Sequence, residues 1–541
     1  MSTSVLSRRQ LLLPTSKPTP SAAPPPAAPA PSAAPTTQPT SPPTAAPSSA
    51  PTGAPTTPGP DGLGDVSVPS VADRHLLSRF SWGITSELVD KAAALGGGRA
   101  WFDRQLEPDT IPDGAADDLL GWWPCLQWSP AAKFAADLDG VYPFFSQDRD
   151  FARWTLMRRI TTNRQLNEVM VDLWGNLLYI TIARKASPHF PMYDATLRKH
   201  ALGTYEALLK AAVLHPAMLC YLDNAKSTMR APNENLGREL LELHTVGRLS
   251  EYSERDVKHS TRILTGHRVM RDGSCVGYYS PEDHFVGKVK VLGFEHPNPL
   301  QDGRDVTDAY LSYLAHHDST ARLVARALAV RFVSDAPSDE LIEAVARAYL
   351  DSGTDIPTTL RALVDHDEFA ASAGQKVRTP VEDFVNTYRV MQATVLPPDG
   401  GTEGAATSIL LSCASMGQQP FEWPRPDGFP DIGEAWSSAC RMLGSWQLHK
   451  KTSAAKLPHE GIVYQPELFW LGPLPVRFDA LVDRLCRLFL AKPATPRLVA
   501  AAARATATQA DDEITATHRI VRALAPTLFL ALLDTPDHMT R

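Results

Sequence analysis

The 541-residue chain has few cysteines and no long apolar run. Its six cysteines stand apart, without the C-x-x-C spacing of zinc ribbons and redox pairs, so neither kind of site is expected. Several of them lie in apolar helical patterns and are predicted to be buried free thiols. No apolar stretch approaches the roughly 18–20 residues that a membrane-spanning helix needs, so no transmembrane span is predicted.

The chain also lacks an excess of basic residues and the common nucleotide-binding and nucleophile motifs. Its formal net charge is -7 and no basic run is present, which argues against nucleic acid as a partner. Neither a G-x-S-x-G elbow, nor a P-loop, nor a G-x-G-x-x-G after a strand occurs. Serine hydrolase, NTPase and dinucleotide-binding classes are therefore unsupported, and no cofactor is predicted.

What the chain has in abundance at its start is proline, alanine, serine and threonine. Residues 1–68 consist largely of these types and cannot bury enough apolar surface to offset their ordering entropy, so they are expected to be disordered. Arg8-Arg9 followed by Leu11–Leu13 looks like a twin-arginine export signal, although Pro14 cuts the apolar core short. Export by a twin-arginine-like route and a cytoplasmic location both stay open.

Residues 69–541 are expected to form a single large helical domain. Residues 151–183 contain the longest helical run, and within it the apolar spacing i, i+4, i+7, i+8 indicates one buried face. The segments 267–271 and 275–279 flank Asp272-Gly273, a β-hairpin signal and the one credible piece of sheet. The predicted fold class is mainly α with a small β-hairpin insertion.

Several segments together are typical of one protein family: ADRHLLSRFSWG, EVMVDLWGNLL, HPAMLCYLDNAKST, NENLGRELLELHTVG and MGQQPFEWPRPDGFPD. On these segments the chain resembles the bacterial family catalogued as domain of unknown function 1800, over residues 71–455, with C-terminal helices in 456–541. The resemblance implies a largely helical fold and a family in which many members look exported, and it brings no established activity. Where the family commonly has W-x-N-H, this chain has Trp174, Asn176 and then Leu177 in place of the histidine.

The stretch from Asn233 to His267 has the densest set of polar side chains. With about 100° per residue on a helix, Arg238, Glu242, Asn235 and Glu239 share one arc, and His244 lies with the leucines on the other side. Asn233 is a good N-cap and Gly247 a good helix stop. A glycine in a helix costs about 1 kcal/mol against alanine, so Gly237 on the apolar side predicts the close approach of another backbone.

This arc supports a first hypothesis, an exported enzyme. Glu239 and Glu242 are candidate acid/base groups, because burial can drive the pKa values of paired carboxyls apart, and Arg238 and His267 are candidates to orient the substrate. The candidate substrate-binding residues are Asn233, Asn235, His284, Lys290 and Trp423. No metal ligand is predicted, because the helix lacks the Glu-x-x-His pair of di-iron bundles and H-E-x-x-H is absent.

The second hypothesis is a non-catalytic binding or assembly protein of the cell envelope, whose partner is an envelope ligand or another protein. In it, Arg238 pairs with Glu242 at i, i+4 and the charges only stabilise the helices. The aromatic side chains around Trp423 either offer a stacking platform for a sugar or a proline-rich partner, or hold an irregular loop against the helical core.

Overall fold

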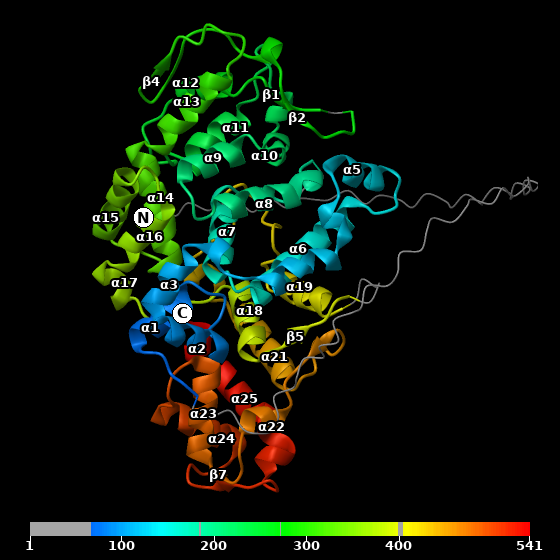
Figure 1. The fold of residues 1–541 in the computed structure, drawn as a ribbon, viewed down its shortest axis with the longest axis vertical. Helices are drawn as coiled ribbons and strands as arrows, with labels where there is room; N and C mark the ends of the chain where they lie inside the picture. Colours follow the sequence, from blue (N-terminus) through cyan, green and yellow to red (C-terminus); the bar gives the residue numbers. More distant parts are fainter. Residues whose placement is uncertain (1–65, 183–184, 271, 399–403) are drawn as a thin grey trace, which may run out of the picture. The chain divides into compact units, whose positions relative to one another are not determined.

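The computed structural model describes residues 66–182, 185–270, 272–398 and 404–541, which belong to a compact unit that spans 59–541. Of the N-terminal tail, only residues 66–68 are among the described residues. The prediction of disorder for the rest of the tail and the Arg8-Arg9 signal therefore fall outside them. Within the described ranges the protein is mainly helical with small two-stranded sheets, which confirms the predicted fold class (Figure 1).

The helices of the first half carry their apolar side chains into a common interior. They are α1 Val71–Arg79, α2 Ser86–Leu95, α3 Gly98–Gln105, α4 Gly114–Asp117, α5 Pro130–Leu138, α6 Phe144–Thr161, α7 Gln165–Leu177, α8 Phe190–His200, α9 Tyr205–Val213, α10 Pro216–Tyr221, α11 Glu234–Glu239 and α12 Glu254–Ile263. A π-helical turn, η6 Leu240–His244, continues α11.

The second half continues in the same manner, and α14, α15 and α16 lie side by side in Figure 1. Its helices are α13 Arg304–Ala315, α14 Asp318–Phe332, α15 Asp339–Asp351, α16 Ile356–Val364, α17 Asp367–Ala371, α18 Pro380–Val390, α19 Ala405–Ser415, α20 Gly433–Trp436, α21 Ala439–Ser453, α22 Glu467–Leu471, α23 Phe478–Leu490, α24 Pro496–Thr506, α25 Ala525–Leu533 and α26 Pro536–Met539. Among the described residues, every helix is too short or too polar to cross a lipid bilayer.

Side-chain caps and prolines explain where many helices begin. Ser253 and Thr379 form capping boxes at the starts of α12 and α18, with Asp256 and Glu382 as the reciprocal acceptors. Proline occupies the first turn of α5, α10, α18 and α24, where its missing N–H costs no hydrogen bond. These starts follow from local sequence alone.

The helical run expected at 151–183 divides into α6 and α7. The chain breaks at residues 162–164, where Asp113 accepts hydrogen bonds from the Thr162 hydroxyl at 2.5 Å and from the Asn163 N–H at 2.6 Å. The carboxylate of Asp113, from an earlier segment, therefore accepts hydrogen bonds from polar groups that lose their helical partners at the break. No local sequence pattern predicts this interruption of the helix.

The predicted hairpin is confirmed, because β1 His267–Val269 pairs antiparallel with β2 Gly277–Tyr279. The expectation of a single piece of sheet is wrong. Three further antiparallel pairs are present: β3 Val289–Val291 with β4 Phe294–His296, β5 Thr394–Val395 with β6 Ile462–Val463, and β7 Val476–Arg477 with β8 Glu513–Ile514. Strands of two or three residues are too short to leave a readable alternation of apolar and polar positions.

Two clusters of buried apolar side chains fill the interior. The larger draws mainly on helices from α1 to α19 and includes Trp82 and Trp174. The smaller is built mainly by α22 to α25, including Trp470 and Phe489, and also contains Val390 at the end of α18. No disulfide joins the six cysteines, all of which lie in the described ranges.

Helix α18 is buried along nearly its whole length and still carries polar side chains. Glu382, Asp383, Asn386 and Thr387 are each at most 3 % exposed. The helix packs against α6, α19 and α21. Because a buried charge or amide needs partners, α18 is where polar networks from distant segments meet.

Candidate functional site

Helix α11 begins where the sequence predicts. The Asn233 side chain accepts a hydrogen bond from the Asn235 N–H at 3.0 Å, so Asn233 is the N-cap. Asn235 itself is exposed. Beyond Glu239 the helix widens into the π turn η6, and His244 at its end is buried with the leucines, as expected. Such turns occur often at functional sites.

Gly237 marks the contact between α11 and α12. A Cβ atom on Gly237 would lie 2.8 Å from the backbone nitrogen of Thr261 and 3.0 Å from its Cα. The Ser260 hydroxyl donates to the Gly237 carbonyl at 3.1 Å. The close approach of another backbone at this glycine is therefore confirmed.

We expect Gly237→Ala to lower the free energy of unfolding by about 1–3 kcal/mol, because overpacking costs more than the helical preference of alanine returns. Gly175→Ala in α7 is the matched control, since its Cβ would have only the Leu197 Cδ1 atom within contact range, at 3.9 Å. Urea titration at pH 7 measures both variants. Equal changes in the two would show that the α11–α12 contact adapts without strain.

Arg238 connects three carboxylates. It pairs with Glu234 at 3.4 Å and with Glu242 at 3.6 Å, and it binds both oxygens of Glu254 on α12 at 2.9 and 2.7 Å. The predicted i, i+4 pair with Glu242 is confirmed. This side chain bridges α11 and α12 at the surface, which fits the structural role of the second hypothesis.

Glu239 is in a different environment. It is half-buried, and its Oε2 atom is enclosed with no hydrogen-bond partner. Burial, together with the negative charges of Glu242 and Asp427, raises the pKa of Glu239 above its ordinary value, while Arg248 and Arg238 oppose this shift. A carboxyl in such surroundings tends to keep its proton.

Glu242, by contrast, has positively charged and hydrogen-bonding neighbours. Arg238 lies 3.6 Å and Arg248 3.8 Å from its carboxylate oxygens. The Tyr252 hydroxyl also donates a hydrogen bond to it. The two glutamates therefore have unlike surroundings: Glu239 has an enclosed oxygen without a hydrogen-bond partner, and Glu242 is paired with two arginines.

The loop that carries Asp427 is anchored on the end of α7. The Asn176 side chain accepts a hydrogen bond from the Phe429 N–H at 3.1 Å, and the backbone of Gly428 lies so close to the Asn176 carbonyl that a Cβ would be 2.5 Å from it. The next carbonyl, that of Leu177, accepts from His244 Nδ1 at 2.9 Å. One helix end thus holds both the α11 segment and the Asp427 loop.

Trp423 lies in this same loop. Its indole N–H donates to Asp427 Oδ1 at 3.0 Å. The Arg425 guanidinium lies 5.2 Å from the indole ring, and the Phe429 ring lies at the same centroid distance. The indole is therefore already in contact with an arginine and another aromatic ring, and it orients Asp427.

His267 and His284 lie together, and their polar contacts are with residues outside α11. His267 Nε2 is 3.3 Å from the Thr307 hydroxyl, and burial and His284 lower its pKa to about 4. His284 bonds the Thr265 carbonyl at 2.9 Å and the Asn298 side chain at 3.1 Å. Strand β1 begins directly after Gly266, and its first residue, His267, lies beside Thr307.

Lys290 is on β3 and faces solvent. Its ammonium donates to Glu295 Oε1 at 2.6 Å, and 54 % of its side chain is exposed. Of the residues singled out in the sequence, Glu239, Glu242 and Trp423 are brought into one region with Asp427, whereas His267, His284 and Lys290 are not.

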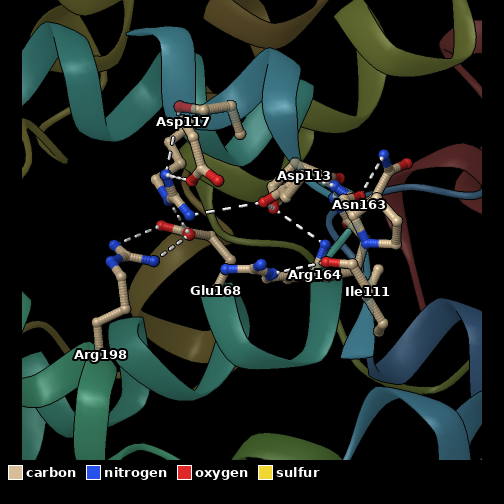
Figure 2. Close-up of polar contacts among 12 residues, drawn as sticks. Ile111, Asp113, Asp117, Asn163, Arg164, Glu168 and Arg198 are labelled. Carbon is tan, nitrogen blue, oxygen red and sulfur yellow. Dashed lines mark hydrogen bonds and ion pairs between the residues drawn. The ribbon is translucent and has the colours of Figure 1, made fainter. Parts of the chain in front are cut away.

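A buried ionic network near the centre of the protein has no counterpart among the sequence predictions. Glu168 on α7 accepts from Arg158 at 3.1 Å and from both Arg198 terminal nitrogens, at 2.5 and 3.2 Å. Figure 2 shows Arg198 and Glu168 pointing toward each other, with Asp113 and Asp117 on the other side of the network. Glu168 is 2 % exposed, so these contacts replace its hydration.

This network borders a cavity of about 50 Å³ between α6, α7 and α8. Its polar lining includes Glu168, Asp172, Asp194 and Asn176, and its apolar wall includes Phe429 of the Asp427 loop. The volume is sufficient for one or two water molecules. The one sequence signal for the network is a pair of acidic residues within the otherwise apolar segment EVMVDLWGNLL. The same pattern is typical of an ordinary amphipathic helix, so it does not by itself predict a buried ionic network.

Comparison with known proteins places the chain in a family without assigning it an activity. A family model described as "Protein of unknown function (DUF1800)" matches residues 75–540. No curated protein and no solved structure matches the chain.

Proposed function

The chain belongs to the DUF1800 family of proteins of unknown function, and from its carboxylate site we propose that it is a hydrolase that uses acid/base catalysis. Glu239 is the proton donor and Glu242 the base. The observation that carries this proposal is the enclosed, unpartnered Oε2 atom of Glu239 beside two further carboxylates.

The proposed chemistry follows from the unlike surroundings of the two glutamates. Glu242, with Arg238 and Arg248 beside it, takes a proton from water as the water oxygen attacks an ester, amide or glycosidic centre. Glu239 gives its proton to the leaving group. Asp427, oriented by Trp423, supports the protonated form of Glu239 through its negative charge.

The test is Glu239→Gln, assayed with the wild type on a panel of cell-envelope polymers and ester substrates. General acid catalysis typically contributes 10²- to 10⁴-fold, so we expect kcat/KM to fall by about a hundredfold or more. The melting temperature should not fall, because the variant removes a carboxyl that burial and like charges disfavour. Glu234→Gln is the matched control, since it makes the same change on the same helix at a partly exposed carboxylate that is paired with Arg238.

A non-catalytic binding or assembly role is the second candidate, and the bridge from Arg238 to Glu254 favours it. In that case neither Glu239→Gln nor Glu234→Gln would change any measured activity. A selective loss of activity in Glu239→Gln therefore separates the hydrolase from the binding protein.

A further inference from the structure

Three potential metal-binding side chains meet inside the protein, far from Glu239 in the sequence. Asp383 on α18, His449 on α21 and His538 on α26 are each at most 2 % exposed. One donor atom from each lies within 4.8 Å of the other two. We refer to these residues as the Asp383–His449–His538 cluster.

The separations suit a single small cation. Asp383 Oδ1 is 3.1 Å from His449 Nε2 and 3.8 Å from His538 Nε2. A tetrahedral ion with bonds of 2.0–2.1 Å holds its ligand atoms about 3.3 Å apart, between these two distances. The two imidazole rings are nearly perpendicular, with centroids 5.2 Å apart, so both can direct a nitrogen towards the same carboxylate oxygen.

Asp383 and His449 also have partners on their other polar atoms. His449 Nδ1 donates to Asp534 Oδ1 at 2.8 Å. His538 Nδ1 lies 3.3 Å from the Asn386 amide nitrogen, which is itself a donor, and His538 Nε2 lies 3.0 Å from the Thr387 hydroxyl. Asp383 Oδ2 accepts from the Ser445 hydroxyl at 2.6 Å and from Arg441 at 3.4 Å. Metal ligands are typically oriented by such outer contacts, and the carboxylate–histidine pair at Asp534 is one of the commonest.

We propose that Asp383, His449 and His538 bind one divalent transition-metal ion, of the zinc or ferrous iron class. Two imidazoles and a carboxylate are the ligand set that these ions favour. Because all three ligands are enclosed, the ion is structural and joins α26 to α18 and α21. The site is separate from Glu239 and does not depend on the proposed hydrolase activity.

The first experiment uses tag-free, full-length wild-type protein. We expect elemental analysis of the purified protein to find about one equivalent of zinc or iron, and 1,10-phenanthroline to remove it with a fall in melting temperature that added Zn²⁺ or Fe²⁺ reverses. A protein without stoichiometric metal, whose melting temperature is unchanged by Zn²⁺ or Fe²⁺, would overturn the proposal. His449 would then be explained as a charged partner held between Asp383 and Asp534.

Two variants locate the ion. Asparagine resembles histidine in the position of Nδ1 and lacks an atom at Nε2, so His449→Asn and His538→Asn keep the outer contacts and remove the ligand atoms. Both should lose the metal. His244→Asn is the matched control, because His244 is a buried histidine whose Nδ1 bonds only a backbone carbonyl, and it should keep the metal. Metal retained in both cluster variants would also overturn the proposal.

Discussion

Replacing Glu168 with glutamine is expected to lower the free energy of unfolding by about 3 kcal/mol or more, because it leaves Arg158 and Arg198 buried beside a neutral side chain. Both arginines lose the charge that they share. Arg198 keeps only Asp194, at 3.1 Å, and Arg158 keeps Asp117 and Asp113, at 3.3 and 3.5 Å, as acidic partners among the described residues. Urea titration at pH 7 on the wild type and the variant measures the effect.

Glu254→Gln is the control for this prediction. It removes an acidic partner of Arg238, but 69 % of the Glu254 side chain is exposed, and surface ion pairs contribute roughly 0–1 kcal/mol. We expect a loss below about 1 kcal/mol in this variant. Losses of similar size in the two variants would mean that water reaches the Glu168 network and hydrates its arginines.

His244→Asn is expected to make the protein more resistant to acid. Burial lowers the pKa of His244 to about 4 in the folded state, against about 6.5 when unfolded. As the pH falls, His244 is therefore protonated in the unfolded chain before it is protonated in the folded protein. The free energy of unfolding decreases for this reason between about pH 6.5 and pH 4. The variant has no imidazole at this position and lacks this contribution to the decrease.

The measurement is the free energy of unfolding of both proteins at pH 8 and at pH 5. The asparagine variant should lose about 2 kcal/mol less than the wild type on going from pH 8 to pH 5. Comparing the change with pH cancels the packing cost of the substitution itself. Identical losses would mean that His244 is protonated in the folded protein at pH 5. His75, His189 and His215, whose pKa values burial also lowers to about 4, keep both proteins acid-sensitive.

Local signals in the sequence predicted much of the helical framework. The cap at Asn233 and the hairpin around Asp272-Gly273 depend on residues within a few positions of each other. A glycine inside a helix was sufficient to indicate the close approach of another backbone at Gly237. Periodicity also placed His244 correctly among the buried leucines. Short-range chemistry decides these features, so a single sequence is sufficient for them.

The candidate site was predictable only in part, because its members are far apart in the chain. Glu239 and Glu242 could be recognised as candidates from the helical pattern. No residue near them in the sequence indicated that Asp427 would lie close enough to affect Glu239, on a loop anchored on Asn176. The contacts of His267 with Thr307 and His284 could not be predicted, because the direction of the chain after Gly266 depends on packing. Asp383, His449 and His538 have no spacing that resembles a metal motif, and only the tertiary fold brings them together.

The buried polar helix α18 has a consequence for how the chain acquires its structure. Its Arg389 binds the Ile160 carbonyl, 229 residues earlier, and its Asp383 binds His449, 66 residues later. Before α6 and α21 pack against α18, water solvates these polar groups better than the partly folded chain does. Early burial of α18 therefore contributes little to stability. Contacts so distant in sequence slow folding, because their loops must close before the contacts stabilise anything. The interior around α18 should therefore form in one late, concerted step.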